Sequence, residues 1–179
     1  MSDPAPPPES ALVVPVPEAE PYVQRHRFRH DSVALRGVPA HITVLYPFVA
    51  PGEMSDAATD AVRDVLAHFP EFPFRLTRLE RFPEGATYLV PEPATPFVDL
   101  TTAIVERFPA HPPYAGAHAQ VIPHLTVAQT PDAPASELAE IERHLPIRCV
   151  AHEAWLMVED GERRWRTRSR FPFAGSARA

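Results

Sequence analysis

The sequence contains no lysine: all 17 basic residues are arginines, they are outnumbered by 23 acidic residues, and the formal net charge is −6. Binding to long nucleic acids depends on basic side chains that neutralise many phosphates without regard to sequence. A chain of this charge is poorly suited to that task. We therefore expect any nucleic-acid substrate to be small or to be bound at one local site.

Cysteine and long apolar runs are equally scarce. Cys149 is the only cysteine and cannot form an internal disulfide, and its apolar surroundings predict a core position rather than a nucleophile. No apolar run approaches the length of a membrane span, and the N-terminus lacks the basic and apolar regions of a signal peptide. We expect a cytoplasmic monomer with no membrane partner.

Proline is abundant, with 24 residues, which favours short helices and strands separated by many turns. The hydrophobic fraction of 45% is typical of a globular protein. The length fits a single domain, which we expect over residues 10–173, with disordered tails at 1–9 and 174–179.

Two stretches of the chain share one pattern. The first contains His41-Ile-Thr-Val44 and the second His124-Leu-Thr-Val127. Side chains alternate between the two faces of a strand, so the histidine and threonine of each motif share one face. The two apolar residues share the other. We expect strands at 40–47 and 121–129, each with a buried apolar back and a polar front.

The segments around the motifs follow the same order in both halves of the chain. Helices are predicted at 18–29, 55–69, 95–108 and 136–144, with Ser55 and Thr95 as the capping residues of the second and third. Further strands are predicted at 11–16, 74–82, 86–90, 147–158 and 163–173. The repeat predicts an α+β fold with two antiparallel sheets flanked by helices. We expect two lobes, about 10–82 and 83–173, with pseudo-two-fold symmetry, a central cleft, and strands free to exchange between lobes.

The two polar fronts suit acid–base chemistry. The ordinary pKa of histidine lies near 6.5, so at neutral pH one imidazole can accept a proton while another donates one. His41 and His124 are therefore the candidate catalytic residues. The hydroxyls of Thr43 and Thr126 can donate to phosphate oxygens, and this division of roles needs no metal and no cofactor.

The paired motifs resemble the signature of the 2H phosphoesterases, the superfamily of bacterial 2'-5' RNA ligase-like proteins. The flanking residues 37–48 and 121–127 are also similar to that family. The resemblance implies a metal-independent cyclic phosphodiesterase that opens a 2',3'-cyclic phosphate on a small nucleotide or an RNA 3' end, leaving a 2'-phosphate. It carries His41 and His124 over as catalytic and Thr43 and Thr126 as phosphate ligands.

Other functions stay open beside this one. Some relatives join or cleave 2'-5' RNA linkages, but members of that kind often carry a basic residue shortly after the second motif, where this chain has Gln129. A non-catalytic nucleotide-binding module is a further alternative. A serine hydrolase is disfavoured, because the sequence has no Gly-x-Ser-x-Gly elbow. Which histidine is the acid depends on how the substrate is oriented.

Residues outside the motifs are weaker candidates. Tyr114, in the irregular loop 109–120, could stack on a base or ribose, and Gln129 could donate a hydrogen bond to substrate. His26 and His30 are expected on the surface rather than at a metal. Four arginines alternate along the last strand, at Arg164, Arg166, Arg168 and Arg170; we expect them to form a solvated face from which at most one reaches the site.

Overall fold

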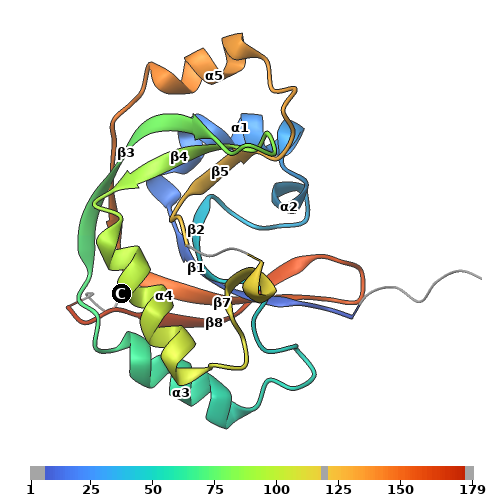
Figure 1. Ribbon diagram of the computed structural model, residues 1–179, viewed down its shortest axis with the longest axis vertical. Coiled ribbons are helices and arrows are strands. Elements are labelled where there is room, and N and C mark those ends of the chain that lie inside the picture. Colours follow the sequence, from blue (N-terminus) through green and yellow to red (C-terminus); the bar gives the residue numbers. More distant parts are fainter. Residues whose placement is uncertain (1–6, 118–120, 176–179) are drawn as a thin grey trace, which may run out of the picture.

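Two four-stranded antiparallel sheets form the protein, whose computed structural model describes residues 7–117 and 121–175 (Figure 1). The first sheet has the order β2-β1-β7-β8, with bounds His41–Leu45, Ser10–Pro15, Glu153–Glu159 and Trp165–Pro172. The second has the order β5-β4-β3-β6, with bounds Leu125–Ala128, Thr87–Glu92, Phe72–Arg81 and Ile147–Ala151. The predicted α+β class with two antiparallel sheets is confirmed.

Helices lie against each sheet. Their bounds are Glu20–His30 for α1, Ser32–Leu35 for α2, Asp56–Leu66 for α3, Thr95–Arg107 for α4 and Ala135–Glu142 for α5, with 3-10 turns η1 at Pro17–Ala19 and η2 at Pro113–Gly116. Helices α3 and α4 contact the first sheet, whereas α1 and α5 contact the second (Figure 1). Ser55 caps α3 as its sequence position suggests, because its hydroxyl accepts from the Ala58 N–H at 3.1 Å. No helix of the described residues is long and apolar enough to cross a membrane.

Each sheet takes strands from both halves of the chain. The first sheet joins β1 and β2 to β7 and β8, which come last in the sequence, while β3 crosses into the second sheet between β4 and β6. Strands are thus exchanged across the boundary near residue 82. The sheets meet where β2 and β5, the two motif strands, contact each other.

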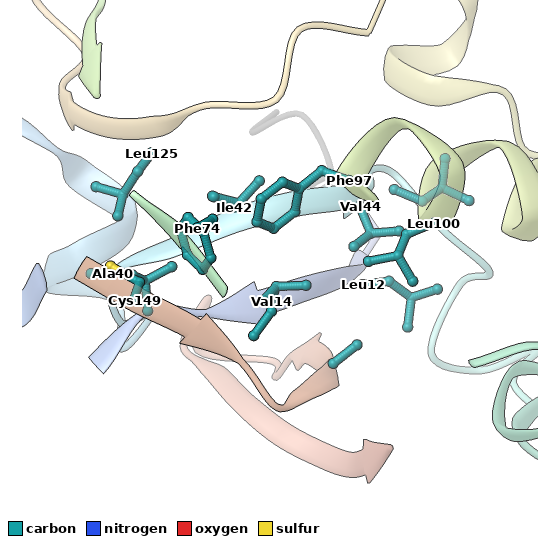
Figure 2. Packing of buried hydrophobic residues seen from close by; sticks show 14 of the residues in the cluster. Leu12, Val14, Ala40, Ile42, Val44, Phe74, Phe97, Leu100, Leu125 and Cys149 are labelled. Carbon is teal, nitrogen blue, oxygen red and sulfur yellow. The ribbon is translucent and has the colours of Figure 1, made fainter. Parts of the chain in front are cut away.

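The apolar backs of both motifs belong to one core. Ile42 and Leu125 have no exposed surface, and their neighbours two residues on, Val44 and Val127, are also buried. Figure 2 shows Ile42, Val44 and Leu125 among core residues from both sheets and α4, namely Leu12, Val14, Phe74, Phe97, Leu100 and Cys149. The predicted core position of Cys149 is confirmed, and burial raises the pKa of its thiol to about 12.

Two local predictions are wrong. The single strand predicted over 147–158 is broken at His152: β6 pairs with β3 in the second sheet, whereas β7 pairs with β1 in the first. The chain therefore changes sheets inside one apolar run. Thr95 does not cap α4, because it is the first helical residue and Ala94 occupies the capping position.

The predicted single face of arginines on β8 is also wrong. The register with β7 shifts between Leu156 and Met157, where β8 carries one extra residue, a β-bulge. Arg166 consequently pairs with Val158, and Arg170 pairs with Trp155. Trp155 and Val158 lie three residues apart on one strand and so face opposite sides of the sheet. Arg166 and Arg170 therefore face opposite sides too.

The prediction of a surface position for His26 is wrong. This residue of α1 is only 3% exposed, and it lies against α5. Its Nδ1 lies 3.4 Å from the Glu137 Oε2, which is 3.0 Å from the Nε2 of His30. The acidic residue that covers His26 comes from a helix far along the chain. Among the residues described, no group of three or more His, Cys, Asp or Glu side chains is arranged to hold a metal ion.

The predicted tails fall largely outside the described residues, which leave out 1–6 and 176–179. Glu9, expected to be part of the disordered tail, is held in place. Its carboxylate accepts from the Tyr46 hydroxyl at 2.6 Å, and its carbonyl accepts from the Glu159 N–H at 2.9 Å. At the other end, Ala174 forms a β-bridge with Pro70.

A buried ion pair joins the end of α1 to α2. The Nε and Nη2 atoms of Arg27 donate to the Asp31 Oδ2 at 3.1 and 2.9 Å, and the two side chains are 2% and 0% exposed. The other carboxylate oxygen of Asp31 accepts from the Val33 N–H and caps α2. Burial raises the pKa of Asp31, with the charge of Arg27 acting in the opposite direction.

Replacement of Asp31 by alanine should lower the free energy of unfolding by about 3–5 kcal/mol, because the Arg27 guanidinium would remain buried without a counter-charge. Urea denaturation followed by circular dichroism measures the change. The matched control is Asp60→Ala, which removes the partner of Arg63 on the exposed face of α3 and should cost less than about 1 kcal/mol. Equal losses in both variants would contradict the buried-pair interpretation.

Candidate active site

Both motifs open into one cavity of about 340 Å³ at the junction of the sheets. His41 and Thr43 project from β2, Thr126 projects from β5, and His124 directly precedes β5, which is shorter than predicted. The remaining walls are Ala11, Val13, Ser32, Val33, Arg36, Val38, Tyr46, Tyr114, Gln129, Met157 and Trp165. The structure thus brings together the four residues singled out by the sequence pattern.

The two histidines are oriented in the same way. The Nδ1 of His41 lies 2.7 Å from the Pro39 carbonyl oxygen, and the Nδ1 of His124 lies 2.6 Å from the Ile122 carbonyl oxygen. A carbonyl oxygen only accepts hydrogen bonds, so each Nδ1 must carry the proton. In the neutral ring, Nε2 is then the atom able to accept a proton. In both motifs the carbonyl belongs to the residue two positions upstream.

The environment of His41 favours its neutral form. Burial, followed by the positive charge of Arg27, lowers the pKa of His41 from its ordinary value of 6.5 to about 4. The hydrogen bond to Pro39 opposes this shift, and His124 adds to it. Because its pKa lies well below neutral pH, His41 is neutral at physiological pH and can accept a proton.

His124 lies in a different electrostatic environment. Burial also lowers its pKa, but the hydrogen bond to Ile122 and the negative charge of Glu84 act in the opposite direction. The rings of Phe82 and Tyr88 enclose the imidazole, with centroid separations of 5.0 and 5.4 Å. The two histidines therefore have the same hydrogen-bond geometry. The charge of Arg27 lowers the pKa of His41, whereas the charge of Glu84 raises the pKa of His124.

A second cavity, of about 420 Å³, adjoins the first and shares with it Tyr114, His124, Thr126 and Gln129. Its other walls are Phe82, Pro83, Glu84, Ala86 and Ile122. A group bound at His124 can consequently extend to either side. The arrangement suits a phosphate that carries a substituent in each compartment.

Tyr114 and Gln129, the two weaker candidates, also lie in the cavity walls. The Tyr114 backbone N–H donates to the Tyr46 carbonyl oxygen at 2.7 Å, which fixes the loop across the end of β2. The side-chain Oε1 of Gln129 accepts from the Ser32 hydroxyl at 2.8 Å and from its backbone N–H at 3.2 Å. Their contact with substrate remains a prediction.

The wall residues that were not found from the sequence include Arg36, Met157 and Trp165. The Arg36 Nη1 donates to the buried Glu159 carboxylate at 2.8 Å, which holds the guanidinium beside the cavity. Gly37 adopts a φ of +102°, and a Cβ there would lie 2.9 Å from the Trp165 carbonyl oxygen, so only glycine fits. The glycine before the first motif was the available signal for this close approach.

The fold and the site define a two-lobed α+β protein in which each sheet contributes one histidine and one threonine to a shared cleft. Solved structures have the same fold. TT0787 of Thermus thermophilus matches with a TM-score of 0.66 and 17% identity, over 94% of this chain and all of that one. E. coli LigT complexed with 3'-AMP matches with a TM-score of 0.63 and 15% identity, over 94% and 99%.

Sequence comparison gives the family. The model of the 2'-5' RNA ligase superfamily matches residues 15–163, and the chain belongs to this superfamily. A similar protein is Putative phosphoesterase GK0864 of Geobacillus kaustophilus (strain HTA426), which is 28% identical over 146 residues, 79% of each chain. The resemblance noted from the paired motifs is confirmed.

The hydrogen bonds and lowered pKa values predict the protonation state of both site histidines. At pH 6.5 an ordinary imidazole is half protonated, whereas His41 should be mainly neutral and His124 should be less protonated than an ordinary imidazole. In both neutral rings the proton should be on Nδ1. Long-range ¹H–¹⁵N spectra measure both properties, and His41→Asn and His124→Asn assign the resonances. A charged ring, or a proton on Nε2, would contradict the geometry.

Proposed function

We propose that this protein is a phosphoesterase that hydrolyses a phosphodiester of a ribonucleotide, opening a 2',3'-cyclic phosphate to a 2'-phosphate without a metal or cofactor. The observation that carries the proposal is the matched pair of motifs in one cavity. Each supplies an imidazole with its Nδ1 bound to a carbonyl and a threonine hydroxyl on the same strand face. The imidazoles can transfer protons, and the hydroxyls can donate hydrogen bonds to phosphate oxygens.

The unequal environments suggest a role for each histidine. The Nε2 of His41, kept neutral, accepts a proton from the attacking water as its oxygen bonds to phosphorus. The bond from phosphorus to the 3'-oxygen breaks, and His124 in its protonated form donates a proton to that oxygen. The Glu84 charge and the bound phosphate both favour protonated His124. Thr43 and Thr126 donate to the non-bridging oxygens, whose negative charge is thereby stabilised.

Two observations support a nucleotide diester over other phosphate compounds. The compartments on either side of His124 provide room for the ribose and the base next to the reacting phosphate. The fold is shared with E. coli LigT, which has been solved in complex with 3'-AMP and with ATP. The same two compartments make hydrolysis of a 2'-5' linkage the second candidate, because that substrate carries a nucleoside on both sides.

Replacement of His41 or His124 by alanine should lower kcat/KM for nucleoside 2',3'-cyclic phosphates by about 10²- to 10⁴-fold, since each removes one proton-transfer group. Thr43→Val and Thr126→Val should each cost about 10²-fold through lost stabilisation of phosphate charge. Chromatography of the products in EDTA measures turnover and distinguishes 2'- from 3'-phosphates. Short 2'-5'-linked oligonucleotides in the same panel test the second candidate.

The control is His68→Ala, because His68 is an exposed histidine whose Nδ1 also bonds to a backbone carbonyl, that of Asp64. This variant should retain full activity. Activity that survives in both His41→Ala and His124→Ala would refute the two-histidine mechanism. Nucleotide binding without turnover in the wild type would leave a binding module as the better description.

The pH dependence of kcat/KM should be bell-shaped with its optimum on the acidic side of neutrality. The acidic limb reports deprotonation of His41, whose pKa is about 4, and the basic limb reports loss of the proton from His124, whose pKa is also lowered. Glu84→Gln removes a charge that raises the His124 pKa, so the basic limb should move to lower pH. Glu162→Gln, which removes an exposed carboxylate in the β7–β8 turn, should leave both limbs in place.

A further inference from the structure

The cleft face of the first sheet continues beyond the cavity. Thr43 pairs with Val13, Val13 pairs with Trp155, and Trp155 pairs with Arg170. Residues paired across antiparallel strands point to the same face, so these four side chains form one row on the side that carries Thr43. Neighbouring strands lie about 4.8 Å apart, which places Trp155 roughly 10 Å from Thr43 across the sheet.

Trp155 and Arg170 form a stacked pair within this row. The Arg170 Cζ lies 4.6 Å from the centroid of the indole ring, and 62% of the arginine side chain is exposed. Glu153 fixes the pair, because its Oε1 accepts from the Trp155 Nε1–H at 2.6 Å and lies 4.0 Å from the Arg170 Nη1. The result is a planar guanidinium on a fixed indole.

The charge balance of the pair favours stacking over phosphate binding. The Glu153 carboxylate lies beside Arg170 and would repel a phosphate placed between them. Flat faces of arginine and tryptophan stack on nucleobases without strong sequence preference. The chemistry at this position therefore fits a base.

The pair lies outside the cavity that faces the histidines. Val13 and Met157 line that cavity, but Trp155, one strand beyond Val13, does not. A nucleoside attached to the reacting phosphate would lie over Val13 and Met157. The nucleotide joined to its 5'-oxygen would then extend over Trp155.

We propose that Trp155 and Arg170 bind the base of the nucleotide preceding the reacting one, so that the substrate is the 3' end of a single-stranded RNA rather than a free mononucleotide. This inference rests on the proposed function, since it takes the scissile phosphate to lie between the two histidines. It also assigns a role to one arginine of the C-terminal row, the one that the β-bulge turns toward the cleft.

The test compares a mononucleoside 2',3'-cyclic phosphate with a trinucleotide ending in the same cyclic phosphate. In the wild type the trinucleotide should have the lower KM. Trp155→Leu and Arg170→Gln should raise KM for the trinucleotide by roughly 10- to 100-fold and leave the mononucleotide unaffected. Trp155→Phe should retain most of the effect of the native residue. Arg166→Gln, on the opposite face of the same strand, is the matched control.

Equal effects on both substrates, or no effect on either, would overturn the inference. Fluorescence anisotropy of a labelled trinucleotide with a 3'-phosphate provides a readout that needs no turnover. If it binds in a manner that depends on Trp155 while no substrate is hydrolysed, the base site stands and the proposed reaction fails. If the mononucleotide is hydrolysed while trinucleotide binding ignores Trp155, the reaction stands and the base site fails. Urea midpoints of the variants verify that each is folded.

Discussion

The strict alternation of side chains along β2 and β5 is the constraint on which the cleft depends. Ile42 and Leu125 have no exposed surface, so a slip of either strand by one residue would bury an imidazole and expose an apolar side chain. The same alternation sets each threonine on the face of its histidine. The apolar residues of both motifs pack in the same core, so the histidine and threonine of each motif face a common cavity.

Two motifs with the same local geometry acquire different properties from their surroundings. The buried Arg27, paired with Asp31, adds a positive charge near His41, whereas Glu84 adds a negative charge near His124. Neither residue belongs to a motif strand. The repeated pattern accounts for the shape of the site, and the segments that are not repeated account for the difference in acidity between its histidines.

Local patterns were enough to predict the class of fold, four of the five α-helices in the described residues and the shared strand face within each motif, because alternation and helix caps such as Ser55 are encoded within a few neighbouring residues. What could not be predicted depends on distant parts of the chain. Nothing near His152 indicates that the strand changes sheets, and only pairing with β7 creates the bulge that turns Arg170. The buried His26 contacts Glu137 of α5, which is far away in the sequence.

The exchange of strands has a consequence for synthesis. The sheet that carries His41 is completed by β7 and β8, which follow all other elements in the chain. When both motifs have left the ribosome, β7 has not yet emerged, and the edge of β1 opposite β2 is still unpaired. The two histidines can become a matched pair only after residues 153–172 have left the ribosome, so the nascent chain has no complete cleft before that point.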